Sequence, residues 1–154
     1  MTHIGKGLLA GAAATVVLSV LMVIKGMMGV MPALDIAKML AGMMGSPDSP
    51  LLGWAAHFVI GVVGYGIAIA VLGYRLNSSP TVSGIIIGVA GWLMMMVVLM
   101  PMAGAGLFAM SMGAMAPVMT LVLHLIFGAV LGWTFGKLVS GASASPQAPA
   151  TRAG

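Results

Sequence analysis

The chain has 154 residues, of which 61% are hydrophobic and only 5% charged, far too few charges to solvate the surface of a water-soluble globule. Its net charge of +4 comes from six Lys and Arg against two Asp, without any basic cluster, which excludes a nucleic-acid-binding surface. The chain contains no cysteine, which excludes disulfides, thiolate metal sites and cysteine nucleophiles.

Four apolar segments are long enough to cross a lipid bilayer, which takes about 20 residues of helix. The predicted spans cover residues 8–24, 51–74, 81–100 and 117–139. Composition and spans together predict an all-α integral membrane fold, with a single four-helix membrane domain over residues 1–139 and the lipid bilayer as its partner.

Two further segments lie outside the spans. Residues 32–42 are predicted to form a short helix at the membrane interface, with Asp35 and Lys38 three residues apart on its wet face. Residues 140–154 are rich in Ser, Ala and Pro, which predicts a disordered cytoplasmic tail.

The lysines and arginines predict the orientation in the membrane, because cytoplasmic loops carry an excess of these residues. With four spans, four of the six lysines and arginines fall on one side of the membrane and two fall on the other. One side has Lys6, Arg75, Lys137 and Arg152, and the other has Lys25 and Lys38. This bias places both the N-terminus and the C-terminus in the cytoplasm.

The two halves of the chain share a pattern. Residues 50–61 and 117–128 both fit Pro-x6-His-x3-Gly, and the span before each carries a Gly-x3-Gly pair, Gly7/Gly11 and Gly84/Gly88. The pattern predicts two duplicated helical hairpins of the same orientation. Such hairpins are related by a parallel pseudo-twofold axis along the membrane normal.

On these paired segments, the chain resembles the small Gly/Met-rich four-helix bacterial inner-membrane proteins that are grouped as a family of unknown function. The resemblance covers about residues 5–139. It implies a fold and a location in the bacterial inner (plasma) membrane, and it implies no activity.

His57 and His124 are the candidate functional side chains inside the membrane. Each lies about 10 Å below its predicted helix end, at 1.5 Å per residue. Ionisable groups at this depth usually face the interior of the bundle. Glycines follow each histidine at spacing four, in the stripes Gly53-His57-Gly61-Tyr65 and His124-Gly128-Gly132-Gly136.

Two interpretations of these histidines stay open. In the first, both imidazoles are axial ligands of haem b, with Gly61, Gly128 and Gly132 leaving room for the porphyrin. In the second, each histidine hydrogen-bonds a neighbouring helix, and the glycines serve close helix packing.

Methionine is the other unusual feature, with 17 residues. Thioethers select Cu(I), so methionines at the side away from the termini suggest copper binding above the two histidines. The alternative is that methionine simply fills gaps between apolar side chains. The candidate copper ligands besides the histidines are pairs at helical i,i+4 spacing: Met27/Met31, Met39/Met43 and Met115/Met119.

Catalytic groups are scarce. The only carboxylates, Asp35 and Asp48, lie outside the spans, and no base–nucleophile pair can be assembled. We therefore expect no enzyme. The leading hypothesis is a non-enzymatic accessory or assembly-type subunit that packs through glycine faces, as a homo-oligomer or within a larger membrane complex. The alternative is a haem b- or copper-binding membrane protein for redox or metal handling.

Overall fold

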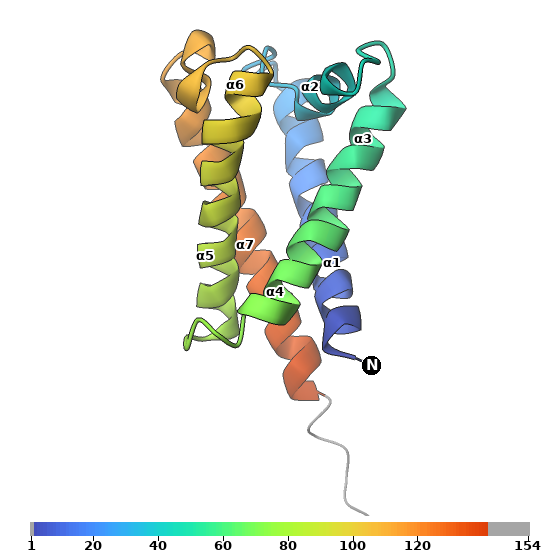
Figure 1. The fold of residues 1–154 in the computed structure, drawn as a ribbon, viewed down its shortest axis with the longest axis vertical. Coiled ribbons are helices and arrows are strands. Elements are labelled where there is room, and N and C mark those ends of the chain that lie inside the picture. The colour runs from blue at the N-terminus through green and yellow to red at the C-terminus, as the bar shows by residue number, and fades with distance from the viewer. Residues whose placement is uncertain (1, 142–154) are drawn as a thin grey trace, which may run out of the picture.

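A computed structural model describes residues 2–141, and within this range every regular element is a helix (Figure 1). Four helices are long and apolar enough to cross a membrane, which confirms the predicted all-helical class and the number of spans. They are His3–Met27, Pro50–Leu72, Pro80–Met102 and Met115–Gly141. The last span continues through Ser140 and Gly141, which were predicted to begin the disordered tail; the rest of the predicted tail lies outside the described residues.

Several spans are built from more than one helical element. The first span is α1 (His3–Met27), and the short helix α2 (Ile36–Met43) follows it. The second span consists of α3 (Pro50–Phe58), the π-helical η1 (Val59–Tyr65) and α4 (Gly66–Leu72). The third consists of α5 (Pro80–Met94), the π-helical η2 (Met95–Leu99) and α6 (Met100–Met102). A 3-10 turn, η3 (Leu107–Met112), leads to the last span, α7 (Met115–Gly141).

Local capping sets where two of these helices begin. The Thr2 hydroxyl accepts a hydrogen bond from the Gly5 N–H at 3.1 Å, so α1 begins well before the predicted apolar run. The Asp35 carboxylate accepts one from the Lys38 backbone N–H at 3.0 Å. Asp35 therefore caps α2, which begins at Ile36 rather than at residue 32.

Helix α7 is the centre of the bundle, because it packs along both α5 and α1. Helix α1 in turn packs on η1 and α4. At the end of the bundle that holds the N-terminus, α4 also contacts α5 and α7. Toward the other end, which carries α2 and which we call the α2 end, α3 leans away from α5 (Figure 1).

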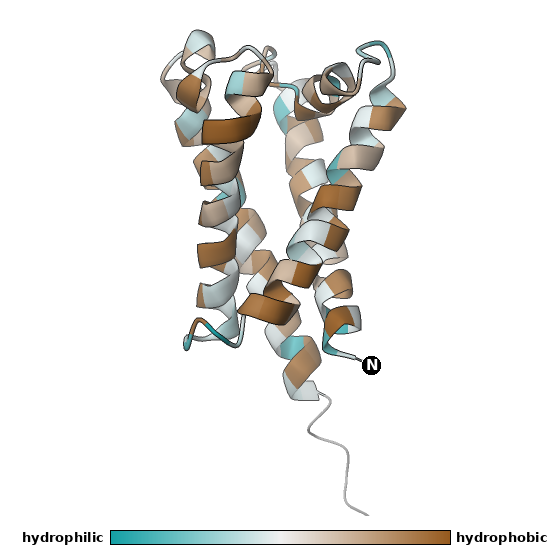
Figure 2. Ribbon diagram, viewed as in Figure 1, coloured by the Kyte–Doolittle hydropathy of each residue, from teal (hydrophilic) through white to brown (hydrophobic). Residues whose placement is uncertain are grey.

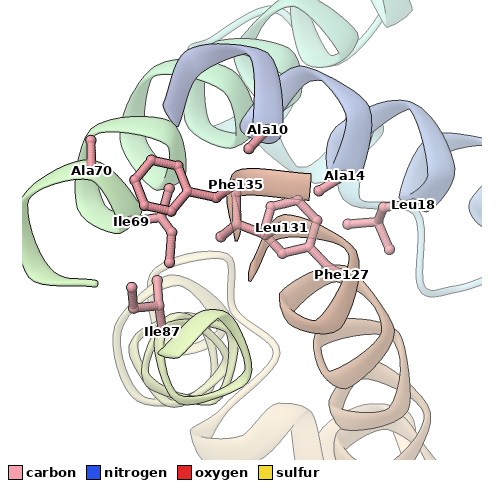
Figure 3. Packing of buried hydrophobic residues seen from close by; sticks show 9 residues of the cluster. All are labelled: Ala10, Ala14, Leu18, Ile69, Ala70, Ile87, Phe127, Leu131 and Phe135. Atoms are coloured by element: carbon pink, nitrogen blue, oxygen red, sulfur yellow. The ribbon is translucent and has the colours of Figure 1, made fainter. Parts of the chain in front are cut away.

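Apolar residues cover the outside of the long helices, while polar residues gather toward the two ends and the loops (Figure 2). On α1, for example, Val16, Val20 and Val23 are all exposed. A continuous apolar exterior of this kind fits a helix bundle whose solvent is lipid. The buried core lies between α1, α4, α5 and α7 and consists of Ala10, Ala14, Leu18, Ile69, Ala70, Ile87, Phe127, Leu131 and Phe135 (Figure 3).

The glycine pairs are used for packing within the chain. A Cβ added to Gly128 would lie 2.5 Å from the Gly84 carbonyl oxygen, and one added to Gly88 would lie 2.6 Å from the His124 carbonyl oxygen. These glycines let α5 and α7 approach backbone to backbone.

The same kind of contact joins α1 to the second span. A Cβ on Gly11 would lie 2.7 Å from the Gly61 carbonyl oxygen, and one on Gly66 would lie 2.9 Å from the Gly7 carbonyl oxygen. Each Gly-x3-Gly pair thus packs on glycines of the span that follows it.

In the second span, the glycines that contact α1 do not follow the spacing of four on which the predicted stripe is based. The sequence placed Gly61 and Tyr65 on the same face, four residues apart. In the structure Gly61 and Gly66, five residues apart, both face α1. The reason is that η1 is π-helical, and a π turn accommodates one residue more than an α turn. Tyr65 is consequently turned away from α1 and toward α5 and α7.

Candidate functional site: a cavity between the helices

A cavity of about 520 Å³ lies where α3 and α5 diverge, and residues from all four spans and α2 line it. Pockets for organic ligands typically have volumes of about 300–1,000 Å³. The lining is largely apolar, and among residues 2–141 it includes no carboxylate. Its side chains with polar groups are Lys25, His57, Tyr65, Thr120 and His124.

Both predicted histidines line this one cavity. His57 is only 9% exposed, and its ring lies edge-on to Trp54 and Phe58, with ring centroids 5.6 and 5.9 Å away. Its Nε2 is buried and has no hydrogen-bond partner among the described residues. Such an unsatisfied group costs free energy unless something else binds it, so this atom is a candidate ligand contact.

His124 is held in a defined tautomer by its own helix. Its Nδ1 lies 2.8 Å from the Thr120 carbonyl oxygen, which can only accept, so Nδ1 carries the proton. In a neutral imidazole the Nε2 lone pair is then available. Histidines that bind metals commonly donate their other N–H to a backbone carbonyl in this way.

Thr120 is itself fixed from two sides. Its hydroxyl donates to the Ala116 carbonyl at 2.8 Å and accepts from the Trp92 Nε1–H of α5 at 3.1 Å. The hydrogen bond from Trp92 thereby joins the turn of α7 that precedes His124 to the third span. The packing interpretation expected each histidine to hydrogen-bond a neighbouring helix. Within residues 2–141, neither histidine does so.

The sequence placed Tyr65 on the stripe of His57 without giving it a role, and in the structure it lines the cavity. Its ring packs edge-on against Phe127, with centroids 4.8 Å apart. Its hydroxyl occupies the place where a Cβ on Gly91 would stand. Tyr65 lines the cavity together with His57 and Gly61 of its predicted stripe, but its contacts with Gly91 and Phe127 join spans that the sequence could not place side by side.

The candidate copper ligands are divided between several environments. Met39 and Met43 line the cavity from α2, whereas Met27 and Met115 are 83% and 59% exposed. Met31 and Met119 are half-buried and do not line it. The methionines that do line the cavity are Met22, Met39, Met43, Met94, Met95 and Met100.

Of the three glycines expected beside the histidines, Gly61 lines the cavity. Gly128 and Gly132 instead face α5, where a Cβ on Gly132 would collide with the Pro80 carbonyl oxygen. These two glycines therefore serve the packing of α7 on α5 and do not line the cavity.

The chain thus combines four helices that are long and apolar enough to cross a membrane with a largely apolar cavity between them. Residues 1–145 match the family of unknown function (DUF6789), and the chain belongs to this family. No curated protein matches the chain. No solved structure matches it either.

Proposed function

We propose that this chain is a non-enzymatic membrane protein that binds haem b in its cavity through His57 and His124. The observation that supports the proposal is a pair of imidazoles on one apolar cavity, each with a nitrogen that the protein does not use: the buried Nε2 of His57 and the lone pair of His124 Nε2. Bis-histidine ligation requires two such nitrogens.

The residues present fit this group in other respects as well. The cavity volume of about 520 Å³ suits an organic cofactor, and the rings of Trp54 and Phe58 restrict the orientation of His57. The Thr120 carbonyl keeps the proton of His124 on Nδ1. When bound, haem would supply one-electron redox chemistry.

Copper is the second candidate, and the six methionines that line the same cavity favour it. A single copper ion needs only ligands about 2 Å away, however, so it would leave most of a 520 Å³ cavity unfilled. The size of the cavity therefore favours haem over copper.

An accessory or assembly-type subunit, as a homo-oligomer or in a larger complex, is the proposal that needs no cofactor. Its motivating feature was the glycine faces. These faces pack within the chain: glycines or other backbone of the same chain contact Gly7, Gly11, Gly84 and Gly88. They therefore do not require a second chain as a packing partner.

We also propose that the fold arose by duplication of a hairpin. Its support is the matching backbone contact in each half, Gly11 on Gly61 and Gly88 on Gly128. For the location we propose the bacterial inner membrane with both termini cytoplasmic. Its support is that Lys6 and Lys137 lie toward the end of the bundle that holds the N-terminus, while Lys25 and Lys38 lie at the α2 end.

The haem proposal is tested by the visible spectrum and metal content of the protein purified after haem- and copper-replete expression. We expect a Soret band that is lost in His57→Ala and in His124→Ala. His3→Ala is the matched control. The His3 Nδ1 lies 2.9 Å from the Tyr74 hydroxyl, and neither residue lines the cavity, so this variant should keep the band.

A Soret band that persists in either cavity variant would overturn the bis-histidine proposal. Copper in place of haem, lost in the same two variants, would establish the second candidate. A folded protein without iron, haem or copper would leave the accessory role.

A further inference from the structure

Lys25 is the only lysine or arginine among the described residues that line the cavity. It lies near the end of α1, where the cavity approaches the α2 end. Its Nζ donates to the Leu34 carbonyl oxygen at 2.7 Å and to the Met31 carbonyl oxygen at 3.1 Å. An ammonium has three N–H donors, so these two bonds leave one for another acceptor.

Among residues 2–141, no carboxylate lines the cavity. Asp35, which caps α2 and does not line the cavity, lies near enough to attract Lys25. A cation in a largely apolar cavity is costly unless an anion pairs with it. The missing partner is therefore expected on the ligand.

The rest of the cavity suits a hydrocarbon body. Apart from His57, Tyr65, Thr120 and His124, the walls below Lys25 are apolar, and the cavity reaches exposed residues on the two diverging spans. Ile60 of η1 is 42% exposed and Met94 of α5 is 67% exposed, and both also line the cavity. The cavity thus opens sideways between η1 and α5, where the surroundings of a membrane protein are lipid tails.

We infer that the cavity takes an anionic amphiphile, whose carboxylate binds Lys25 at the α2 end and whose apolar body extends toward His57 and His124. This inference rests on the proposed function only in requiring a large apolar ligand. A haem propionate and a fatty-acid carboxylate offer the same chemistry to Lys25, so the test includes both.

The experiment compares acids with their esters on the full chain in nanodiscs of zwitterionic lipid. The probes are haem b with its dimethyl ester, followed by absorbance, and cis-parinaric acid with its methyl ester, followed by fluorescence. Wild-type protein is compared with three variants. Lys25→Gln keeps amide N–H donors but no charge, Lys25→Arg keeps the charge, and Lys38→Gln removes an exposed lysine that does not line the cavity.

For at least one pair, wild type should bind the acid roughly tenfold more tightly than the ester, as expected for a charge-assisted hydrogen bond. The preference should persist in Lys38→Gln and Lys25→Arg and disappear in Lys25→Gln. Equal binding of acid and ester to wild type, binding of no probe, or an unchanged preference in Lys25→Gln would overturn the inference. The comparison on wild type holds even if a variant does not fold.

The two proposals fail separately. If only the fatty acid shows the Lys25-dependent preference and haem does not bind, the haem assignment is wrong and the inference stands. If haem and its ester bind equally through the histidines and the parinaric pair shows no preference, the haem assignment stands and the inference is wrong.

Discussion

The two histidines differ in how the protein treats their ring nitrogens. His124 donates Nδ1–H to the carbonyl one turn before it, a contact that any helical histidine can reach. His57 has a buried Nε2 without a partner in the described part of the chain. The sequence placed both at equal depth and predicted that they need partners. It could not show that one is satisfied locally while the other is not.

Substituting Gly91 tests the close contact between this residue and the Tyr65 hydroxyl at the cavity wall. Gly91→Ala should lower the free energy of unfolding by about 1–3 kcal/mol, because the new methyl group overlaps the Tyr65 hydroxyl. Tyr65→Phe removes that hydroxyl and should recover part of the loss. The measurement is reversible unfolding of the single and double variants in mixed detergent micelles.

Gly26→Ala is the control for this cycle, since a Cβ on this helical glycine would meet nothing within 4 Å. It should be neutral or slightly stabilising. Additive effects of Gly91→Ala and Tyr65→Phe would contradict the contact.

At the scale of elements, the π turn decides which residues of the second span face the cavity. Gly61 and Gly66 contact α1 at a spacing of five, whereas Gly128 and Gly132 contact α5 at a spacing of four. One additional residue in the second span explains the difference. It also explains why Tyr65 is free to point across the bundle.

Deleting Val63, an exposed residue of η1, should therefore be tolerated. Gly61 and Gly66 would become four residues apart, the α-helical spacing that α7 already uses on α5. Deleting Val130, between Gly128 and Gly132 of α7, should instead abolish folding. It would rotate everything beyond it by about 100° relative to α5.

The yield of folded protein after size-exclusion chromatography, together with the thermal unfolding midpoint, measures both deletions. If the two deletions cause an equal loss of folded protein, the π-helical turn does not arise from one additional residue in η1.

At the scale of the whole molecule, the short loops and the termini decide the orientation. Because the chain contains no cysteine, single cysteines report on each side without background. Asp48→Cys lies before α3 at the α2 end, and Ser78→Cys lies between α4 and α5 at the other end. In intact cells a membrane-impermeant maleimide should label Asp48→Cys, while Ser78→Cys should react only after lysis.

Labelling of both positions before lysis would mean that they do not lie on opposite sides of the membrane. The reverse pattern would place the termini outside and overturn the orientation that the lysines and arginines predict.

The sequence by itself determined the all-helical class and the four helices that are long and apolar enough to cross a membrane, because apolar length is a local quantity. It also predicted a short helix at residues 32–42 with Lys38 on its wet face, and Lys38 is an exposed residue of α2.

Only the tertiary structure decided that both histidines line one cavity, that Lys25 lies at its α2 end, and that Tyr65 crosses it. These facts depend on the lean of α3 away from α5 and on one π turn. Both concern contacts between spans far apart in the sequence, including backbone contacts at glycines, whose partners a local pattern does not identify.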